Sequence, residues 1–185
     1  MRPENLGRTI RRGNPLVDIK CDNSFYSGMA TRLLDEIAQT RPFGSLEQEA
    51  HLSVARTAAV LEHALSEALK TSGVTPTQYN VLRILRGAGS AGLCRNEVSS
   101  RMVARVPDAT RLLDRMEAAG LIQRARDGED RRYVTTRISE EGLRLLAELD
   151  EPMMALHRAH FARFTEAELT TLIDLLARVR GTICP

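Results

Sequence analysis

Four polar or charged side chains between Thr110 and Arg115 have the chemistry to contact a nucleic acid. Drawn as a helix, this segment separates into an apolar stripe and a polar face. The stripe contains Ala109, Leu112, Leu113 and Met116, and the polar face contains Thr110, Arg111, Asp114 and Arg115. A guanidinium can bond to both O6 and N7 of guanine, so Arg111 is our main candidate for a base contact. Thr110 is placed to reach base edges or phosphates, and Arg115 either reaches a phosphate or pairs with Asp114 or the segment that follows.

Flanking residues predict where this helix begins and ends. Pro107 suits the first helical turn, where a missing amide hydrogen costs nothing, and Gly120 suits the position just past the end. Residues 121–125 and 133–138 then alternate in character, with turn-forming residues between them at 127–130. We therefore expect a recognition helix followed by a β-hairpin wing.

Capping patterns predict the other helices, because a Ser or Thr with Glu or Gln three residues later can satisfy free backbone amides. These patterns place helices from Ser45 to about Thr71, from Thr75 to about Gly87, from Cys94, from Ser139 and from Thr165 to about Arg180. Pro152 lies inside the fourth of these and removes a backbone hydrogen bond, so we expect a bend there. The predicted fold class is mainly α: a winged helix-turn-helix with a small β-hairpin wing and long N- and C-terminal dimerisation helices.

Apolar stripes on the first and last long helices predict a homodimer. The residues assigned to this interface are Val54, Leu61, Leu65, Leu169, Leu172 and Leu176. A winged core of about 60 residues is too small to cover three flanking helices, so we expect two copies of the chain to bury part of this surface. The alternative is that both stripes pack within one chain, as some of each must.

Charge and composition narrow the class of protein. Residues 76–137 carry 12 arginines against 7 acidic residues, whereas the rest of the chain has 14 basic and 17 acidic residues. Concentrated positive charge is expected of a surface that faces phosphates. No apolar run approaches the roughly 20 residues of a membrane helix, and the N-terminus has no secretion signal, so we expect no membrane partner. Three scattered cysteines favour neither disulfides nor a zinc knuckle, which indicates a cytoplasmic protein.

Catalysis is the least expected function. The histidines have no nucleophile or acid at a useful spacing, and no glycine-rich loop could hold a phosphate. We predict no catalytic residues and no cofactor. His157 and His160 have a spacing that could present two metal ligands, but no third ligand of clear spacing accompanies them, so we assign no metal.

Several ordered segments together resemble the MarR family of bacterial regulators. They are VTPTQYNVLRILRGAG, NEVSSRM, TRLLDRMEAAGLIQR, the wing sequence Asp130-Arg131-Arg132, and the run Ile138-Ser139-Glu140-Glu141-Gly142. The resemblance covers most of the chain, from Ser45 to Arg180. It implies a homodimeric winged helix-turn-helix protein that binds double-stranded DNA at a pseudo-palindromic, inverted-repeat operator, commonly under the control of a small molecule or an oxidant.

The resemblance also implies roles for the wing. Arg132 matches the wing arginine that enters the minor groove, and Asp130 matches the acid that orients it. Arg131 extends the same basic loop, and Arg95 and Asn96, at the start of a short helix, are plausible contacts to the DNA backbone. Two alternatives remain: the wing is a solvated turn with a local Asp–Arg pair, or the whole fold is a protein-interaction module that binds no specific DNA.

The amino-acid sequence does not identify an effector site. His51, Arg56 and Tyr79 could supply polar groups to a ligand, or could be ordinary surface and core residues. Cys94, at a helix N-cap, or Cys21 could sense oxidants, although a small structural residue is the alternative for both.

The chain is expected to divide near residue 45. Residues 1–45 form an N-terminal extension with a basic, flexible arm and a possible short helix over 29–39, and translation starting at Met29 would delete the arm. The arm could touch DNA phosphates or be a disordered tail. Residues 46–185 form the MarR-like domain with its dimerisation helices.

Overall fold

The computed structural model describes residues 32–126 and 134–181. The N-terminal arm, Cys21 and the wing residues Asp130, Arg131 and Arg132 lie outside the described residues. The chain divides into two compact units, residues 1–58 and 59–185. Each unit is described by itself.

The first unit contains α1 and the beginning of α2. Helix α1 spans Leu33–Glu36, so the described part of the predicted 29–39 helix is a single turn, which ends before Ala38 at a φ of 50°. The long α2 spans Leu46–Leu69 and begins after Ser45, as predicted. The Ser45 hydroxyl accepts from the amide of Gln48 at 3.2 Å, whereas the Gln48 side chain accepts from the amide of Gly44 at 2.7 Å.

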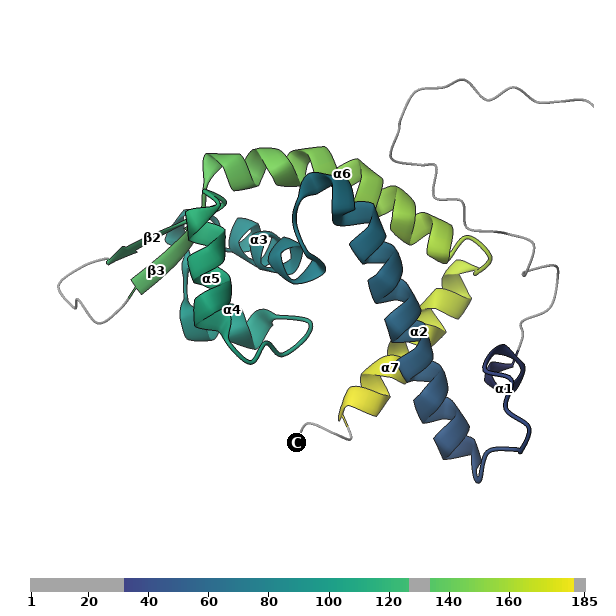
Figure 1. Cartoon of the computed structure of the whole chain (residues 1–185). Helices are drawn as coiled ribbons and strands as arrows, with labels where there is room; N and C mark the ends of the chain where they lie inside the picture. The colour runs from purple at the N-terminus through teal and green to yellow at the C-terminus, as the bar shows by residue number, and fades with distance from the viewer. Residues whose placement is uncertain (1–31, 127–133, 182–185) are drawn as a thin grey trace, which may run out of the picture. The chain divides into compact units, whose positions relative to one another are not determined.

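The second unit is a winged helix-turn-helix followed by two further helices (Figure 1). Its elements are the end of α2, α3 (Pro76–Ala88), β1 (Leu93–Cys94), α4 (Arg95–Arg101), α5 (Ala109–Ala118), β2 (Ile122–Arg126), β3 (Val134–Ile138), α6 (Glu140–His160) and α7 (Glu166–Gly181), with short 3-10 turns at Lys70–Ser72 and Gly89–Ala91. The mainly α fold class with a small β wing is therefore confirmed.

Local capping contacts place the helix starts where the sequence predicts them. The Thr75 hydroxyl accepts from the amide of Gln78 at 3.2 Å, and the Glu97 carboxylate accepts from the amide of Cys94 at 2.7 Å. Helix α6 runs through Pro152 as one helix, and it curves along its length (Figure 1). Pro152 therefore does not end this helix, and a bend at Pro152 itself stays a prediction.

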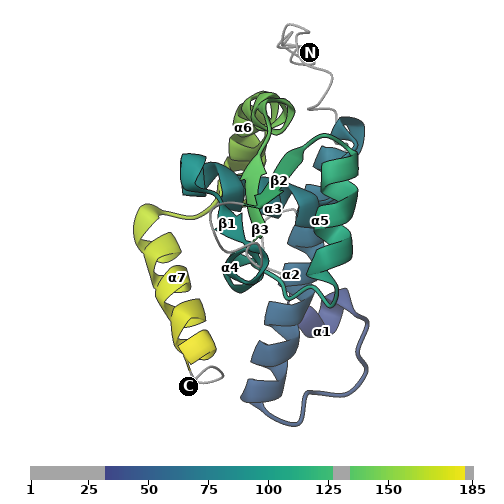
Figure 2. The same ribbon diagram turned by 90° about the vertical axis from the view of Figure 1, so that its left-hand side faces the viewer.

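The strands form one antiparallel sheet in the order β1-β3-β2. Arg124 of β2 and Leu93 of β1 both face Thr136, which is buried in the central strand. Figure 2 shows this sheet with α5 beside it. The short β1 strand, which the sequence analysis did not predict, ties the start of α4 to the base of the wing.

The core joins α3, α5 and β2 to α6. Buried apolar side chains from α3, α5, β2 and α6 form one cluster, which includes Leu82, Leu85, Leu112, Leu113, Met116, Ile122, Leu146, Leu149 and Met153. The stripe predicted for α5 is thus its buried face, and its polar residues are left on the outside. Burial of this stripe is what holds α5 against the rest of the unit.

The start of α5 differs from the prediction. The helix begins at Ala109, and the Asp108 carboxylate caps it by accepting from the amide of Arg111 at 3.0 Å. Pro107 therefore lies before the cap and outside the first turn, because a capping aspartate one residue later sets the boundary. The end agrees: Gly120 has a φ of 73°, and the amide of Leu121 donates to the carbonyl of Met116, a Schellman stop.

An ion pair joins α3 to α6 across 64 residues of sequence. The Arg86 guanidinium donates two hydrogen bonds to the Asp150 carboxylate, at 2.7 and 2.8 Å. These hydrogen bonds hold the pKa of Asp150 below its ordinary value, in spite of partial burial. The pair therefore joins α3 to α6, two helices whose buried side chains belong to the same core.

We expect Asp150→Asn to lower the free energy of unfolding by about 1 kcal/mol at pH 7, since a two-pronged but part-exposed pair is lost. The folded pKa of Asp150 is depressed, so the contribution of the pair is present above the ordinary aspartate range and is lost as the pH falls through the lowered pKa. Urea titrations should therefore show the two proteins converging below about pH 4. Glu151→Gln, at a carboxylate whose side chain is 77% exposed, is the control and should change little.

Candidate nucleic-acid interface

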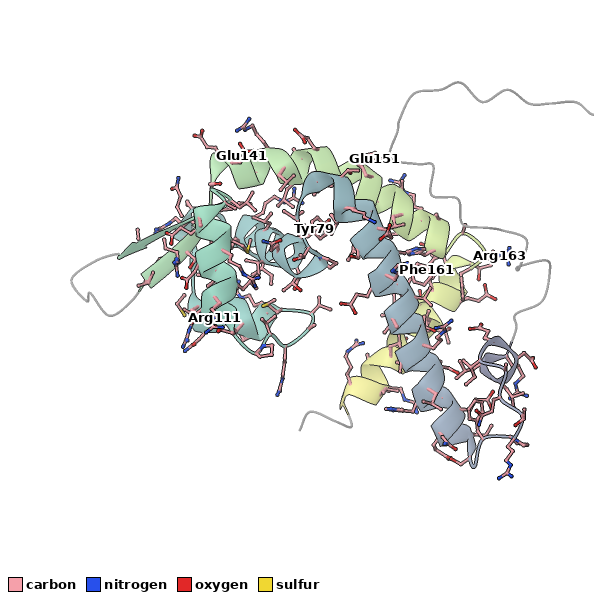
Figure 3. The ribbon with its side chains drawn as sticks, in the orientation of Figure 1. Tyr79, Arg111, Glu141, Glu151, Phe161 and Arg163 are labelled. Carbon is pink, nitrogen blue, oxygen red and sulfur yellow. The ribbon has the colours of Figure 1, made fainter. Side chains whose placement is uncertain are left out.

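Helix α5 presents its polar face to solvent, as the sequence predicts. The side chain of Arg111 is 84% exposed and points outward near the start of the helix (Figure 3). Its Nε lies 3.1 Å from Asp108 Oδ2, so the capping carboxylate also steadies the guanidinium. Thr110 and Arg115 are exposed on either side of it. This face therefore presents an exposed guanidinium and a hydroxyl group to solvent.

The start of α4 lies against the start of α5. Arg95 Nη1 donates to the Thr110 hydroxyl at 3.3 Å, and Arg95 Nη2 donates to Asn96 Oδ1 at 3.1 Å. These three predicted contact residues, separated by up to 15 positions in sequence, are thus brought together. With Cys94, Arg124 and Thr136 they line an open groove between the two helices and the base of the wing.

Arg115 does not pair with Asp114. Its Nε donates to the carbonyl oxygen of Arg111 at 3.3 Å, and its side chain stays on the exposed face. Asp114 pairs with Arg124 of β2 instead, with 2.6 Å between Oδ1 and Nη2. Of the alternatives open for Arg115, pairing with Asp114 is therefore wrong, because a strand arginine occupies that carboxylate.

Arg124 is the residue of this region that the sequence analysis missed. Its guanidinium and its backbone amide both donate to Glu117, near the end of α5. The hydrogen bonds from Arg124 lower the pKa of Glu117, and those from Glu117 raise the pKa of Arg124. The sequence held one signal for this pair: Glu117 lies in the last turn of the predicted helix, and Arg124 follows seven positions later, after the turn.

The residues considered for a ligand are scattered over different environments. Tyr79 is buried, and its hydroxyl accepts from Arg83 Nη1 at 2.9 Å. Arg56 lies 3.9 Å from Glu36, and His51 is exposed. These three residues therefore do not come together in one ligand site, and they do not identify the effector.

His157 and His160 lie in the last turn of α6. Partial burial lowers the pKa of His160, and the charge of His157 lowers it further. In residues 32–126 and 134–181 no group of three His, Cys, Asp or Glu side chains is placed to hold a metal ion. In the same part of the chain, no helix is both long and apolar enough to cross a membrane.

The predicted dimer residues keep apolar surface on the outside. Within the described residues α7 has no buried side chain, and Leu169, Leu172 and Leu176 are half-buried. Ile173 of the same helix is 62% exposed. On α2, Leu61 and Leu65 are half-buried, and Val54, in the first unit, is 44% exposed. The single chain therefore leaves these stripes partly uncovered.

Comparison with known proteins gives one consistent result. The model of the MarR family matches residues 74–134, which contain α3, α4, α5 and β2. The uncharacterised HTH-type transcriptional regulator YsmB of Bacillus subtilis is 30% identical over 128 residues, which cover 69% of this chain and 86% of that protein. Coverage differs among relatives: the chain spans 64% of a putative regulatory protein for the hcr operon of Thauera aromatica, at 30% identity over 59% of this chain.

Solved structures agree with this result. A MarR transcription factor from Planctomyces limnophilus is 34% identical, with a TM-score of 0.57 over 74% of this chain and 98% of that chain. A mutant MarR from E. coli, solved in complex with operator DNA, shares the fold at 23% identity, with a TM-score of 0.65 over 80% of this chain and 99% of that chain.

Proposed function

Since this chain belongs to the MarR family, whose members are transcriptional regulators and not enzymes, we propose that it is a homodimeric repressor that binds an inverted-repeat operator. The observation that carries the proposal is the outer face of α5. Arg111 stands exposed there beside Thr110, which Arg95 holds from the start of α4. A protein interface does not need an exposed guanidinium at the start of a helix, whereas the reading of a DNA groove does.

Each residue of this face has a proposed contact. Arg111 bonds to a guanine edge in the major groove, and releasing it from Asp108 is the cost of that contact. Arg115, Arg95 and Asn96 bind phosphates, which position the helix but carry no sequence information. Pro107, just before the cap, borders the same surface. The proposal includes Asp130, Arg131 and Arg132 of the wing, which lie outside the described residues.

The partly uncovered apolar stripes of α2 and α7 support a dimeric assembly. A two-fold dimer through α7 and α2 would present two recognition helices to half-sites about 10 bp apart, centre to centre. The E. coli protein crystallised with operator DNA has the same fold, which supports DNA as the partner. We propose in addition that the protein acts in the cytoplasm and that a small molecule controls its binding, as the family resemblance implies.

Arg111→Ala should weaken binding to the preferred operator by about 1–3 kcal/mol and flatten base preference at one position in each half-site. Selection of DNA from a random pool, followed by anisotropy titration at fixed salt, measures both effects. The matched control is Arg158→Ala, which removes the same charge from α6, where the side chain is 64% exposed. The control should keep the base preference. A wild-type protein that selects no sequence from the pool would contradict the proposed function.

A further inference from the structure

Arg124 connects the recognition helix to the first strand of the wing through three side-chain contacts and one backbone contact. Its Nε lies 2.8 Å from Glu117 Oε2, and its Nη2 lies 2.5 Å from the same oxygen and 2.6 Å from Asp114 Oδ1. Its backbone amide donates to Glu117 Oε1 at 3.2 Å. Glu117 therefore holds both the side chain and the backbone of β2. We call Arg124, Glu117 and Asp114 the strand–helix clamp.

The clamp lies where it can control the relative position of α5 and the β2–β3 hairpin, the two elements proposed to face DNA. Asp114 lies between Arg111 and Arg115 on the recognition helix, and Glu117 is one turn after it. Arg124 lies in the middle of β2, opposite the buried Thr136 of β3, at the base of the wing. A shift between α5 and β2 would therefore move the recognition helix relative to the hairpin that carries the wing.

The clamp also reduces the negative charge that Asp114 and Glu117 would otherwise present next to the DNA. Two carboxylates on a helix that lies in a groove would repel the phosphates. In the clamp both face a guanidinium whose side chain is only 23% exposed, while the side chains of Asp114 and Glu117 are 52% and 38% exposed. Arg124 is thus occupied by protein carboxylates, unlike Arg111, whose side chain is 84% exposed.

We propose that Arg124 is a positioning residue, which locks β2 onto the recognition helix through Glu117 and Asp114 so that helix and wing meet the DNA as one rigid unit. This inference rests on the proposed DNA-binding function. It makes two acidic residues of the DNA-facing region favourable for binding, although each is repelled by phosphate. A guanidinium suits the role because its planar fork can bond to both carboxylates at once.

The test is a set of operator titrations with Glu117→Gln, Arg124→Gln, Arg124→Lys and the double variant Glu117→Gln/Arg124→Gln. Glu117→Gln should weaken operator binding about tenfold, because a charged pair is lost from the clamp. Arg124→Gln should cost about as much, and the double variant should be no weaker than either single one, because both act through one contact. Arg124→Lys should bind less tightly than wild type, since an ammonium cannot form the fork.

The alternative is that Arg124 binds a DNA phosphate directly, and it predicts different affinities for the variants. If Arg124 simply faced a phosphate, Arg124→Lys would bind as tightly as wild type, and Glu117→Gln would tighten binding by removing repulsion. Either result, or effects that multiply in the double variant, would overturn the inference. Glu148→Gln, at an exposed acid on α6, is the control for net charge and should leave the affinity unchanged.

A second measurement needs no DNA. Hydrogen exchange should show faster exchange of the Arg124 amide in Glu117→Gln than in wild type, with the α6 amides unchanged. Equal rates in the two proteins would overturn the clamp even where operator binding is normal. A wild-type protein without sequence preference would instead contradict the proposed function, and the exchange result would still decide whether α5 and β2 are locked together.

Discussion

Leu172→Glu should dissociate the proposed dimer and weaken operator binding by at least about 100-fold, since the second half-site no longer adds its contacts. Leu172 is half-buried in the single chain, on a helix in which no described side chain is buried. A glutamate there would place an unpaired charge in the apolar interface. Leu176→Glu, one turn further along the same stripe, should have the same effect.

Sedimentation at micromolar concentration measures this effect, with circular dichroism to show that the chain remains folded. The matched control is Thr171→Glu, which adds the same charge at an exposed position of α7 outside the stripe and should leave a dimer. A wild-type protein that sediments as a monomer, yet binds an inverted repeat tightly, would show that α7 is not the dimer interface.

Gly142→Ala should destabilise the fold by about 3 kcal/mol, because the added methyl group has no room. Gly142 is buried in the first turn of α6, where its amide donates to the Ser139 hydroxyl at 3.0 Å. A Cβ at this position would overlap the carbonyl oxygen of Leu121 and lie 2.8 Å from Ile138 Cγ1. The carbonyl belongs to the turn between α5 and β2, so backbone and not a flexible side chain would have to move.

Thermal unfolding measures this effect, and a loss of about 3 kcal/mol corresponds to a fall in Tm of roughly 6–12 °C for a chain of this length. Gly87→Ala is the control, since a Cβ at that position in α3 meets nothing within 4 Å. The control should be neutral or slightly stabilising, because alanine favours a helix over glycine. Equal melting temperatures for Gly142→Ala and wild type would mean that the turn after α5 can yield.

Local contacts of this chain follow from its sequence, whereas long-range contacts do not. Helix starts at Ser45, Thr75, Cys94, Ser139 and Thr165 were predicted correctly, because a cap bonds to an amide three residues away and the pattern is complete within one turn. The stripe of α5 and the stop at Gly120 were correct for the same reason. The prediction that Pro107 lies in the first turn of α5 was wrong, because Asp108 caps the helix one residue later.

What the amino-acid sequence determined by itself was therefore the set of long helices, the buried face of α5 and the exposed Arg111. Only the tertiary structure decided which partners meet across the chain: Asp150 with Arg86, Arg124 with Asp114 and Glu117, β1 with β3, and Gly142 with the carbonyl of Leu121. Asp114 and Arg115 are adjacent in sequence, yet the Asp114 carboxylate forms its ion pair with Arg124. Side-chain pairing depends on distances set by packing of the core, and no local pattern contains those distances.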